Sequence, residues 1–288
     1  MTTTAPTTRP ASAPGAPPIS LPAALPPPAP PSPAPAAPAA GGPAPLRWRD
    51  APLILMYHSV ADVPNPADDP HLLSVSPRRF AAHMAWLHGR GLRGVGVDEL
   101  LTAIRDRRAR GLVGITFDDG YADLVDGALP ALRTFGFGAT VFVVAGRLGT
   151  TNDWDDTPPR PLLDAAGIRR LADAGVEIGS HGSTHTALAG AGQRVLAAEV
   201  ADSRHRLAEL VGAPVTGFAY PYGVVDGAAR AAVRDAGYTY ACAVSTPRGC
   251  LDLTALPRIY AGNSDRGRHL AAKRLLYRAY IPLRGGLR

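Results

Sequence analysis

The sequence predicts an α/β protein in which six or seven βα units form a largely parallel sheet that closes, or nearly closes, into a barrel. Two observations lead to this prediction. After residue 46, short apolar runs alternate with amphipathic stretches, which is the pattern of repeated βα units. The chain beyond that point has about 240 residues, a usual size for one α/β barrel.

The N-terminal part differs from the rest of the chain in composition. Its first 46 residues are mostly Ala, Pro, Thr, Ser and Gly and have no apolar periodicity, which predicts a disordered, locally polyproline-like arm. We therefore expect three parts: the arm at 1–46, a folded domain at 47–266, and a basic C-terminal helix or tail at 267–288.

The predicted elements alternate along the folded domain. Strands are expected where short apolar runs lie between turn residues, namely at 53–57, 112–117, 139–145, 176–180, 215–220, 238–244 and 256–261. Helices are expected where apolar side chains recur at helical spacing, namely at 78–91, 98–111, 128–136, 162–175, 194–212 and 227–237. The first of these helices ends at glycine, a common terminator.

Unusual polar residues lie where the predicted strands end. His58 follows the first strand. Later strands are followed by Asp118, Asp119, His181, His185, Pro221 and Tyr222, and Arg258 lies within the last predicted strand. The carboxyl ends of the strands of a parallel barrel converge on one face, where active sites are built. We therefore expect these residues to meet in space although they are far apart in the sequence.

A metal site is the hypothesis that best accounts for four of them. The spacing of His181 and His185 predicts two imidazoles on one side of a helical turn, and Asp119 would complete a His-His-Asp ligand set. Asp118 and Asp119 are adjacent acids that are costly to ionise together unless a cation lies nearby. The alternative for the Asp-Asp-Gly segment is an ordinary turn, but together with the histidines the pattern favours a metal.

The motifs also resemble a known family. TFDDG at 116–120, SHGSTH at 180–185 and PYG at 221–223, in this order, resemble the NodB-type polysaccharide deacetylases of carbohydrate esterase family four. LMYHSV at 55–60 resembles one branch of that family, which has an N-terminal Tyr-His motif and no C-terminal Leu-x-His. The resemblance covers roughly residues 52–262 and implies a distorted (β/α) barrel with fewer than eight complete units.

The resemblance further implies an activity and roles for particular residues. The activity is metal-dependent hydrolysis of the N-acetyl group of an acetylated sugar or polysaccharide, which releases acetate and leaves a free amine. Asp119, His181 and His185 match the ligands of one divalent ion, often zinc, with cobalt or another divalent ion as alternatives. Asp118 matches the general base, and the backbone N–H of Tyr222, next to Pro221, is expected to stabilise the oxyanion.

Two departures from the family pattern lead to further expectations. The arginine that usually precedes Pro-Tyr is absent, and Arg258 is expected to orient Asp118 instead, although it could also point to solvent or cap the barrel. The late Leu-x-His is absent too, since His269 lies in a predicted helix. His58 is therefore the expected general acid, with a structural role at the barrel rim as the alternative.

Trp154, in the long loop after the third strand, is expected to stack on a sugar ring, and a purely structural role is the alternative. Other functions stay open on the sequence alone: hydrolysis of another amide or a small heterocyclic ring, or catalytically silent sugar binding. Four intact polar site residues argue against silence. The glycan is also open, among peptidoglycan, chitin-like oligomers, poly-N-acetylglucosamine, a lipid-linked sugar and a small N-acetylglucosaminyl metabolite.

Charge and cysteine content exclude some partners and compartments. The net charge of +6 comes mostly from Arg scattered over helices, so we expect no nucleic-acid binding. The basic C-terminal segment 273–288 could rest on an anionic membrane surface, but packing on the domain is favoured. Cys242 and Cys250 are expected to be ordinary small residues. The lack of a signal segment or spanning apolar run favours a cytoplasmic or inner-membrane-surface location.

Overall fold

The computed structural model describes residues 53–244 and 252–284, together with Met1. The predicted arm at 1–46 and Cys250 lie outside the described residues, apart from Met1. Among the described helices, none combines the length and the apolar character needed to cross a membrane.

The strands form one parallel sheet that almost closes on itself. The strand order is β8-β7-β6-β5-β4-β3-β1-β9, and β2 pairs with β3 beside this path. The strands are β1 (Ile54–Tyr57), β2 (Arg93–Val95), β3 (Leu112–Phe117), β4 (Thr140–Val143), β5 (Glu177–Ser180), β6 (Gly217–Ala219), β7 (Tyr240–Ala243), β8 (Leu256–Pro257) and β9 (Ile259–Tyr260).

The closure of the sheet depends on the segment at 256–261, which we predicted to be a single strand. It is two short strands, of which β8 pairs with β7 and β9 pairs with β1. Only Arg258 separates them. This one segment therefore joins the two ends of the sheet, and the residue at the junction cannot pair regularly with either neighbour.

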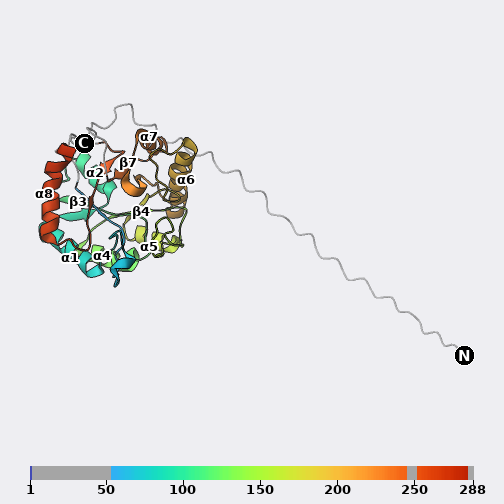
Figure 1. The fold of residues 1–288 in the computed structure, drawn as a ribbon, viewed down its shortest axis with the longest axis horizontal. Helices are drawn as coiled ribbons and strands as arrows, with labels where there is room; N and C mark the ends of the chain where they lie inside the picture. The colour runs from blue at the N-terminus through green and yellow to red at the C-terminus, as the bar shows by residue number, and fades with distance from the viewer. Residues whose placement is uncertain (2–52, 245–251, 285–288) are drawn as a thin grey trace, which may run out of the picture. The chain divides into compact units, whose positions relative to one another are not determined.

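Helices lie outside the strands, as Figure 1 shows for α1, α4, α5, α6, α7 and α8 around the central β3, β4 and β7. The helices are α1 (Pro77–His88), α2 (Val97–Arg105), α3 (Leu124–Gly127), α4 (Leu129–Phe135), α5 (Ala165–Asp173), α6 (Gln193–Val211), α7 (Gly227–Asp235) and α8 (Gly267–Arg284), with short 3-10 turns η2 (Pro66–Asp68) and η3 (Pro221–Gly223). Among the described residues no helix separates β7 from β8, so the βα repeat is incomplete there.

Local sequence explains where several helices begin and end. The side chains of Ser76 and Asp164 accept hydrogen bonds from backbone N–H groups in the first turns of α1 and α5, which caps both helices. Helix α2 ends at Arg105 and not at 111 as we predicted, because Arg107 turns into the left-handed region with φ 58°. Strand β2 and helix α3 were not predicted, since segments of three or four residues are too short to show a period.

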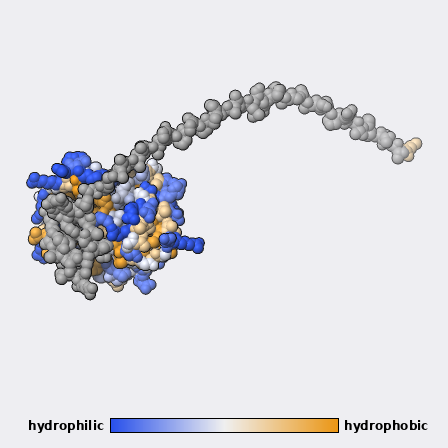
Figure 2. All heavy atoms as spheres, turned by 90° about the horizontal axis from the view of Figure 1, so that it is seen from above, coloured by the Kyte–Doolittle hydropathy of each residue, from blue (hydrophilic) through white to orange (hydrophobic). Residues whose placement is uncertain are grey.

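The barrel core explains the stability of the sheet beneath the site. Tyr57, Phe80 and Phe117 are buried and pack against one another, with ring centroids 5.2 to 5.7 Å apart. A second buried cluster includes Phe142 and Tyr240. On the outside, hydrophilic and hydrophobic residues are interspersed, with hydrophilic ones prominent along the edges of the face in Figure 2.

Candidate active site

A cavity of about 280 Å³ opens at the carboxyl ends of the strands. It is lined by one residue of β1, by residues that follow β1, β3, β5, β6 and β7, and by two loop segments: Met56, His58, His71, Leu73, Asp118, Asp119, Trp154, Asp155, His181, His185, Tyr222, Gly223 and Val244. Most of the polar residues that the sequence placed at strand ends therefore meet in one cavity.

Three of the lining residues form a buried cluster suited to a metal ion. Asp119 Oδ1 lies 3.4 Å from Nε2 of His181 and 3.4 Å from Nε2 of His185. One ligand atom from each residue lies within 4.8 Å of the others. Nδ1 of His181 lies 2.8 Å from the carbonyl oxygen of Ala219, and donation to that oxygen leaves Nε2 unprotonated toward the cluster. Two imidazole nitrogens and a carboxylate oxygen are a donor set that fits a divalent ion.

The two histidines meet through a turn and not through a helix, which corrects the expectation of a helical turn. The segment between β5 and α6 has no helix before Gln193, and Gly182 and His185 have φ values of 82° and 64°. These left-handed residues fold the segment back so that the His181 and His185 rings lie 5.0 Å apart.

A residue that sequence reasoning missed holds this turn in place. Glu199, on the buried side of α6, accepts hydrogen bonds from the backbone N–H of Ser183 at 2.8 Å and of Thr184 at 3.0 Å. It also accepts one from the Thr184 hydroxyl at 2.5 Å. An acidic residue on the inner side of a long helix was the signal, because a buried carboxylate needs partners.

Backbone strain is concentrated at the site. Asp119, His185 and Tyr222 have φ values of 68°, 64° and 60°, in the left-handed region that disfavours residues other than glycine. Each such residue costs about 1–3 kcal/mol. That three of them lie around one cavity indicates that the fold maintains this geometry against a local penalty.

Asp118 forms a buried, two-pronged ion pair with Arg258. Nη1 of Arg258 donates to Oδ1 of Asp118 at 2.5 Å, and Nη2 donates to Oδ2 at 2.7 Å. Nη1 also donates to the hydroxyl of Thr116 at 3.2 Å. Burial by itself raises the pKa of Asp118, but its neighbours, Arg258 foremost, bring that pKa below the ordinary value. Asp118 is therefore ionised at neutral pH.

The charges of the site act on one another. Burial tends to raise the pKa of Asp119, but the adjacent imidazoles of His181 and His185 hold it well below the ordinary value. His58, partly exposed at the end of β1, has its pKa lowered by burial, and the nearby Asp119 and Asp118 charges offset this only in part. Nδ1 of His58 is buried and has no hydrogen-bond partner within the described part of the chain.

Two aromatic residues pack on the His185 ring. The Trp154 ring stacks on it with a centroid distance of 4.4 Å and an interplanar angle of 25°. The Tyr222 ring meets it at 4.7 Å and 65°, and the Tyr222 side chain is 51 % exposed. Pro221 is buried beside it in η3. One wall of the cavity is therefore aromatic, and Trp154 touches a predicted metal ligand.

Several lining residues had no signal in the sequence reading. His71, Leu73 and Asp155 lie in loops without a recognisable motif, and the fold brings them to the cavity. Their positions follow from how the loops at 69–75 and 147–161 are tied to the barrel, which depends on contacts distant in sequence.

Comparison with known proteins agrees with this architecture. A model of the polysaccharide deacetylase family matches residues 105–241. The Bacillus subtilis protein YxkH, assigned to the polysaccharide deacetylases, is 30 % identical over 187 residues, or 64 % of this chain and 61 % of YxkH. The match thus spans less than two thirds of that protein's length.

Two solved structures share the fold. One is the Streptococcus pyogenes deacetylase PplD in complex with acetate, with a TM-score of 0.66 and 22 % identity over 77 % of this chain and 96 % of that chain. The other is a Bacillus anthracis protein assigned to the polysaccharide deacetylases, with a TM-score of 0.63 and 23 % identity over 76 % of this chain and 67 % of that chain. The predicted (β/α) barrel is confirmed.

Proposed function

We propose that this chain, whose residues 105–241 match a model of the polysaccharide deacetylase family, hydrolyses the N-acetyl group of an acetylated amino sugar within a glycan, releasing acetate and leaving a free amine. One observation carries the proposal. An ionised carboxylate, Asp118, lies directly beside the buried cluster of Asp119, His181 and His185 in the same cavity. A base next to a metal-binding cluster is an arrangement that can hydrolyse an amide.

Asp119, His181 and His185 would hold the divalent ion. The donor atoms and the tautomer of His181 fit such an ion, and zinc accepts this ligand set readily. When bound, the ion would supply Lewis-acid polarisation of the acetamide carbonyl and activation of the attacking water. The left-handed turns at Asp119 and His185 support this role, since strain of this kind is maintained where function needs it.

In this proposal Asp118 accepts the proton of the attacking water. Arg258 keeps the carboxylate ionised and fixes both of its oxygens, so that the base is already oriented before substrate binds. Arg258, between β8 and β9, thereby takes the role of the arginine that the family usually has ahead of the Pro-Tyr pair and that this chain lacks ahead of Pro221. Arg258 acts through Asp118 and is a positioning residue.

His58 donates the proton that the leaving amine needs. It lines the same cavity as Asp118, and the nearby Asp119 and Asp118 charges favour its protonated form, which partly offsets the lowering of its pKa by burial. The backbone N–H of Tyr222 stabilises the developing oxyanion. The Tyr222 and Trp154 rings offer apolar faces for the sugar, since pyranose rings stack on aromatic side chains.

Acetate release tests the proposal. Purified protein supplied with zinc or cobalt is assayed on short N-acetylglucosamine oligomers, beside Asp118→Asn, His58→Ala and the exposed control Arg93→Met. We expect Asp118→Asn and His58→Ala to lose activity by about 10²-fold or more, with metal content unchanged in an elemental analysis. Arg93→Met is expected to behave as wild type.

The outcomes separate the parts of the proposal. No acetate from metal-loaded wild type on these oligomers or on acetylated polysaccharides would reject deacetylation of amino sugars. A fully active His58→Ala would reject His58 as the acid while leaving the base and the metal ligands in place. Asp119→Asn, analysed for metal beside these variants, should bind less, and a wild-type metal content in it would reject the ligand set.

A further inference from the structure

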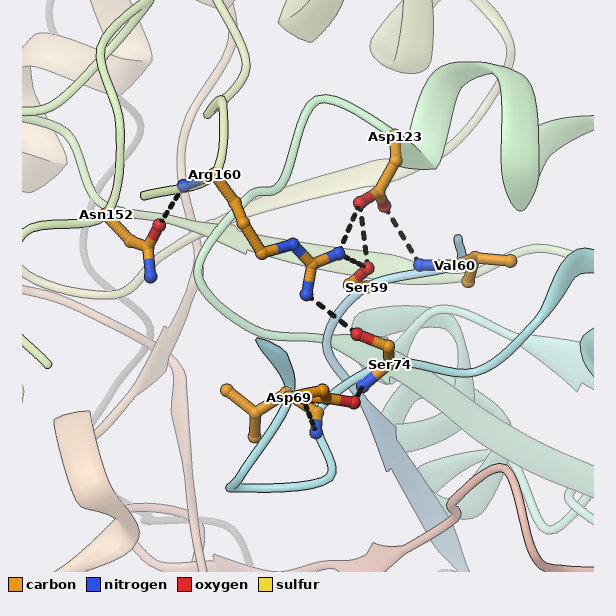
Figure 3. A network of polar contacts seen from close by, with 8 residues as sticks. Ser59, Val60, Asp69, Ser74, Asp123, Asn152 and Arg160 are labelled. Carbon is orange, nitrogen blue, oxygen red and sulfur yellow. Dashed lines mark hydrogen bonds and ion pairs between the residues drawn. The ribbon is translucent and has the colours of Figure 1, made fainter. Parts of the chain in front are cut away.

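One arginine outside the predicted site contacts several segments that also carry residues lining the cavity or lie close to them. Figure 3 shows the Arg160 guanidinium between Ser59, Ser74 and Asp123. It donates from Nη1 to the Ser74 hydroxyl at 2.7 Å and from Nη2 to Oδ2 of Asp123 at 3.0 Å. Nη2 also donates to the Ser59 hydroxyl. These three partners come from three segments far apart in sequence.

The first of these segments carries His58. Asp123 accepts hydrogen bonds from the Ser59 hydroxyl at 2.8 Å and from the backbone N–H of Val60 at 2.9 Å. The backbone immediately after His58 is therefore held by the carboxylate that Arg160 also binds. Asp123 is the N-cap residue of α3, four residues after Asp119, so the same carboxylate joins the β1 end to the β3 end.

The second segment carries His71 and Leu73, which line the cavity. The backbone N–H of Ser59 donates to the Leu73 carbonyl at 3.2 Å, and that of Val75 donates to the Ser59 carbonyl at 3.0 Å. Asp69 closes this loop by accepting from the N–H groups of Leu73 at 2.8 Å and Ser74 at 2.9 Å. The hydroxyl of Ser74 is then the point at which Arg160 reaches the loop.

Arg160 itself belongs to the loop that carries Trp154 and Asp155. Its base is closed by Asn152, which is buried, accepts from the N–H of Arg160 at 2.6 Å and donates its own N–H to the Arg160 carbonyl at 3.1 Å. The loop between these two residues extends to the cavity, where Trp154 stacks on His185. Arg160 thus lies at the base of the Trp154 loop, and its side chain connects this loop to the segment that follows His58.

The chemistry of these contacts goes beyond general packing. The guanidinium lies over the Tyr121 ring at 4.7 Å, and Tyr121 is two residues from Asp119. A planar fork with several fixed donors can bind three acceptors at once, which a lysine ammonium on a flexible chain does less well. The Arg160 and Asp123 side chains are 19 % and 24 % exposed, so this is a linkage at the rim of the barrel and not part of its apolar core.

We propose that Arg160 is a positioning residue that sets the Trp154 loop and the His71 loop relative to His58 and Asp118, and so fixes the width of the substrate cavity. This inference rests on the proposed deacetylase function for its kinetic consequence. Its structural consequence, the coupling of the three wall segments, does not depend on that function.

The test uses full-length metal-loaded protein as wild type, Arg160→Ala, Arg160→Lys and the control Arg170→Ala. The control removes an exposed arginine that pairs with Asp126 at 3.6 Å between Nη2 and Oδ1. Asp126 lies in α3, three residues after Asp123. Amide hydrogen exchange is followed in peptides that cover 58–60, 69–75 and 152–160. Acetate release from an N-acetylglucosamine oligomer gives kcat and KM separately.

In Arg160→Ala we expect faster exchange in all three peptides and a KM raised about tenfold, with a smaller change in kcat, because charge-assisted hydrogen bonds that position the walls are lost. Millimolar guanidinium should lower the KM of Arg160→Ala part of the way toward the wild-type value. The KM of Arg160→Lys should lie between those of wild type and Arg160→Ala. Arg170→Ala should match wild type in every measurement.

Two results would overturn the inference: faster exchange confined to 152–160, or an unchanged KM in an active Arg160→Ala. A wild type that releases no acetate rejects the deacetylase function instead, and the exchange measurement then decides on the coupling by itself. A uniform rise of exchange over the whole domain, with a large fall in Tm, would show a general folding role and would also reject positioning.

Discussion

Replacing Arg258 by methionine tests the buried ion pair that we assign to base positioning. The Arg258 side chain is fully buried and that of Asp118 is 4 % exposed, with two hydrogen bonds of 2.5 and 2.7 Å between them. Methionine keeps most of the apolar volume of the side chain but removes the guanidinium, whose Cζ lies 5.5 Å from the centre of the Phe142 ring in the native protein. The carboxylate of Asp118 then loses the neighbour that does most to offset its burial.

The expected magnitude follows from this burial. Removing one partner of a buried pair destabilises a protein by about 3–5 kcal/mol, because the other charge is left uncompensated. Protonation of Asp118 limits this loss, since burial raises the pKa of the carboxyl once Arg258 is gone. A protonated base cannot accept a proton from water, so we expect acetate release to fall by about 10²-fold or more.

The assay combines urea unfolding, acetate release and metal content. Arg93→Met is the matched control, because Arg93 pairs with Glu99 at 2.6 Å while both side chains are about half exposed. Such a pair contributes only about 0–1 kcal/mol. The double variant Arg258→Met with Asp118→Asn should unfold at a higher urea concentration than Arg258→Met alone, since no unpaired carboxylate remains.

The reasoning is refuted if Arg258→Met unfolds within about 1 kcal/mol of wild type and keeps its acetate release, because a buried fork cannot be removed without either effect. Lost activity together with lost metal would point to collapse of the site and not to the base. Lost activity with full metal content and a measurable loss of stability is the expected combination.

Three further predictions concern other parts of the molecule. Asp119→Asn should lower bound zinc by about tenfold or more in equilibrium dialysis, because it removes one of three ligands, and unchanged binding would contradict the assignment. Trp154→Ala should raise KM for a glycan oligomer more than Trp154→Phe does, since phenylalanine keeps an aromatic face; equal values would show that no sugar stacks there. His83 should make stability fall in acid. Burial is the main cause that lowers the pKa of folded His83 below the ordinary value of 6.5. Neutral His83 contacts the Tyr57 hydroxyl and the Asp265 carbonyl, and the stability from these contacts is fully present above pH 6.5. It is lost as the pH falls through the folded-state pKa. The free energy of unfolding, measured in urea at several pH values, should fall less steeply in acid for His83→Gln than for wild type. Parallel curves for the two proteins would reject this role of His83.

The sequence by itself determined the order of the barrel and the location of the site. Alternating apolar and amphipathic stretches predicted most strands and helices within a few residues, because burial of one face leaves a periodic trace in the chain. Polar residues at strand ends predicted that Asp118, Asp119, His181 and His185 would share a cavity, since the carboxyl ends of parallel strands lie on one face. The family resemblance supplied the roles proposed for them.

Only the tertiary structure decided how these residues are held. The division of 256–261 into two strands at Arg258, and with it the pairing of Arg258 with Asp118, results from closure of the sheet between β8 and β9. Glu199 accepts hydrogen bonds from the turn that precedes His185, and Arg160 joins the segments of Ser74 and Asp123 to its own loop. Each of these joins segments far apart in the chain, and local periodicity carries no information about such contacts because it records only which face of a segment is buried.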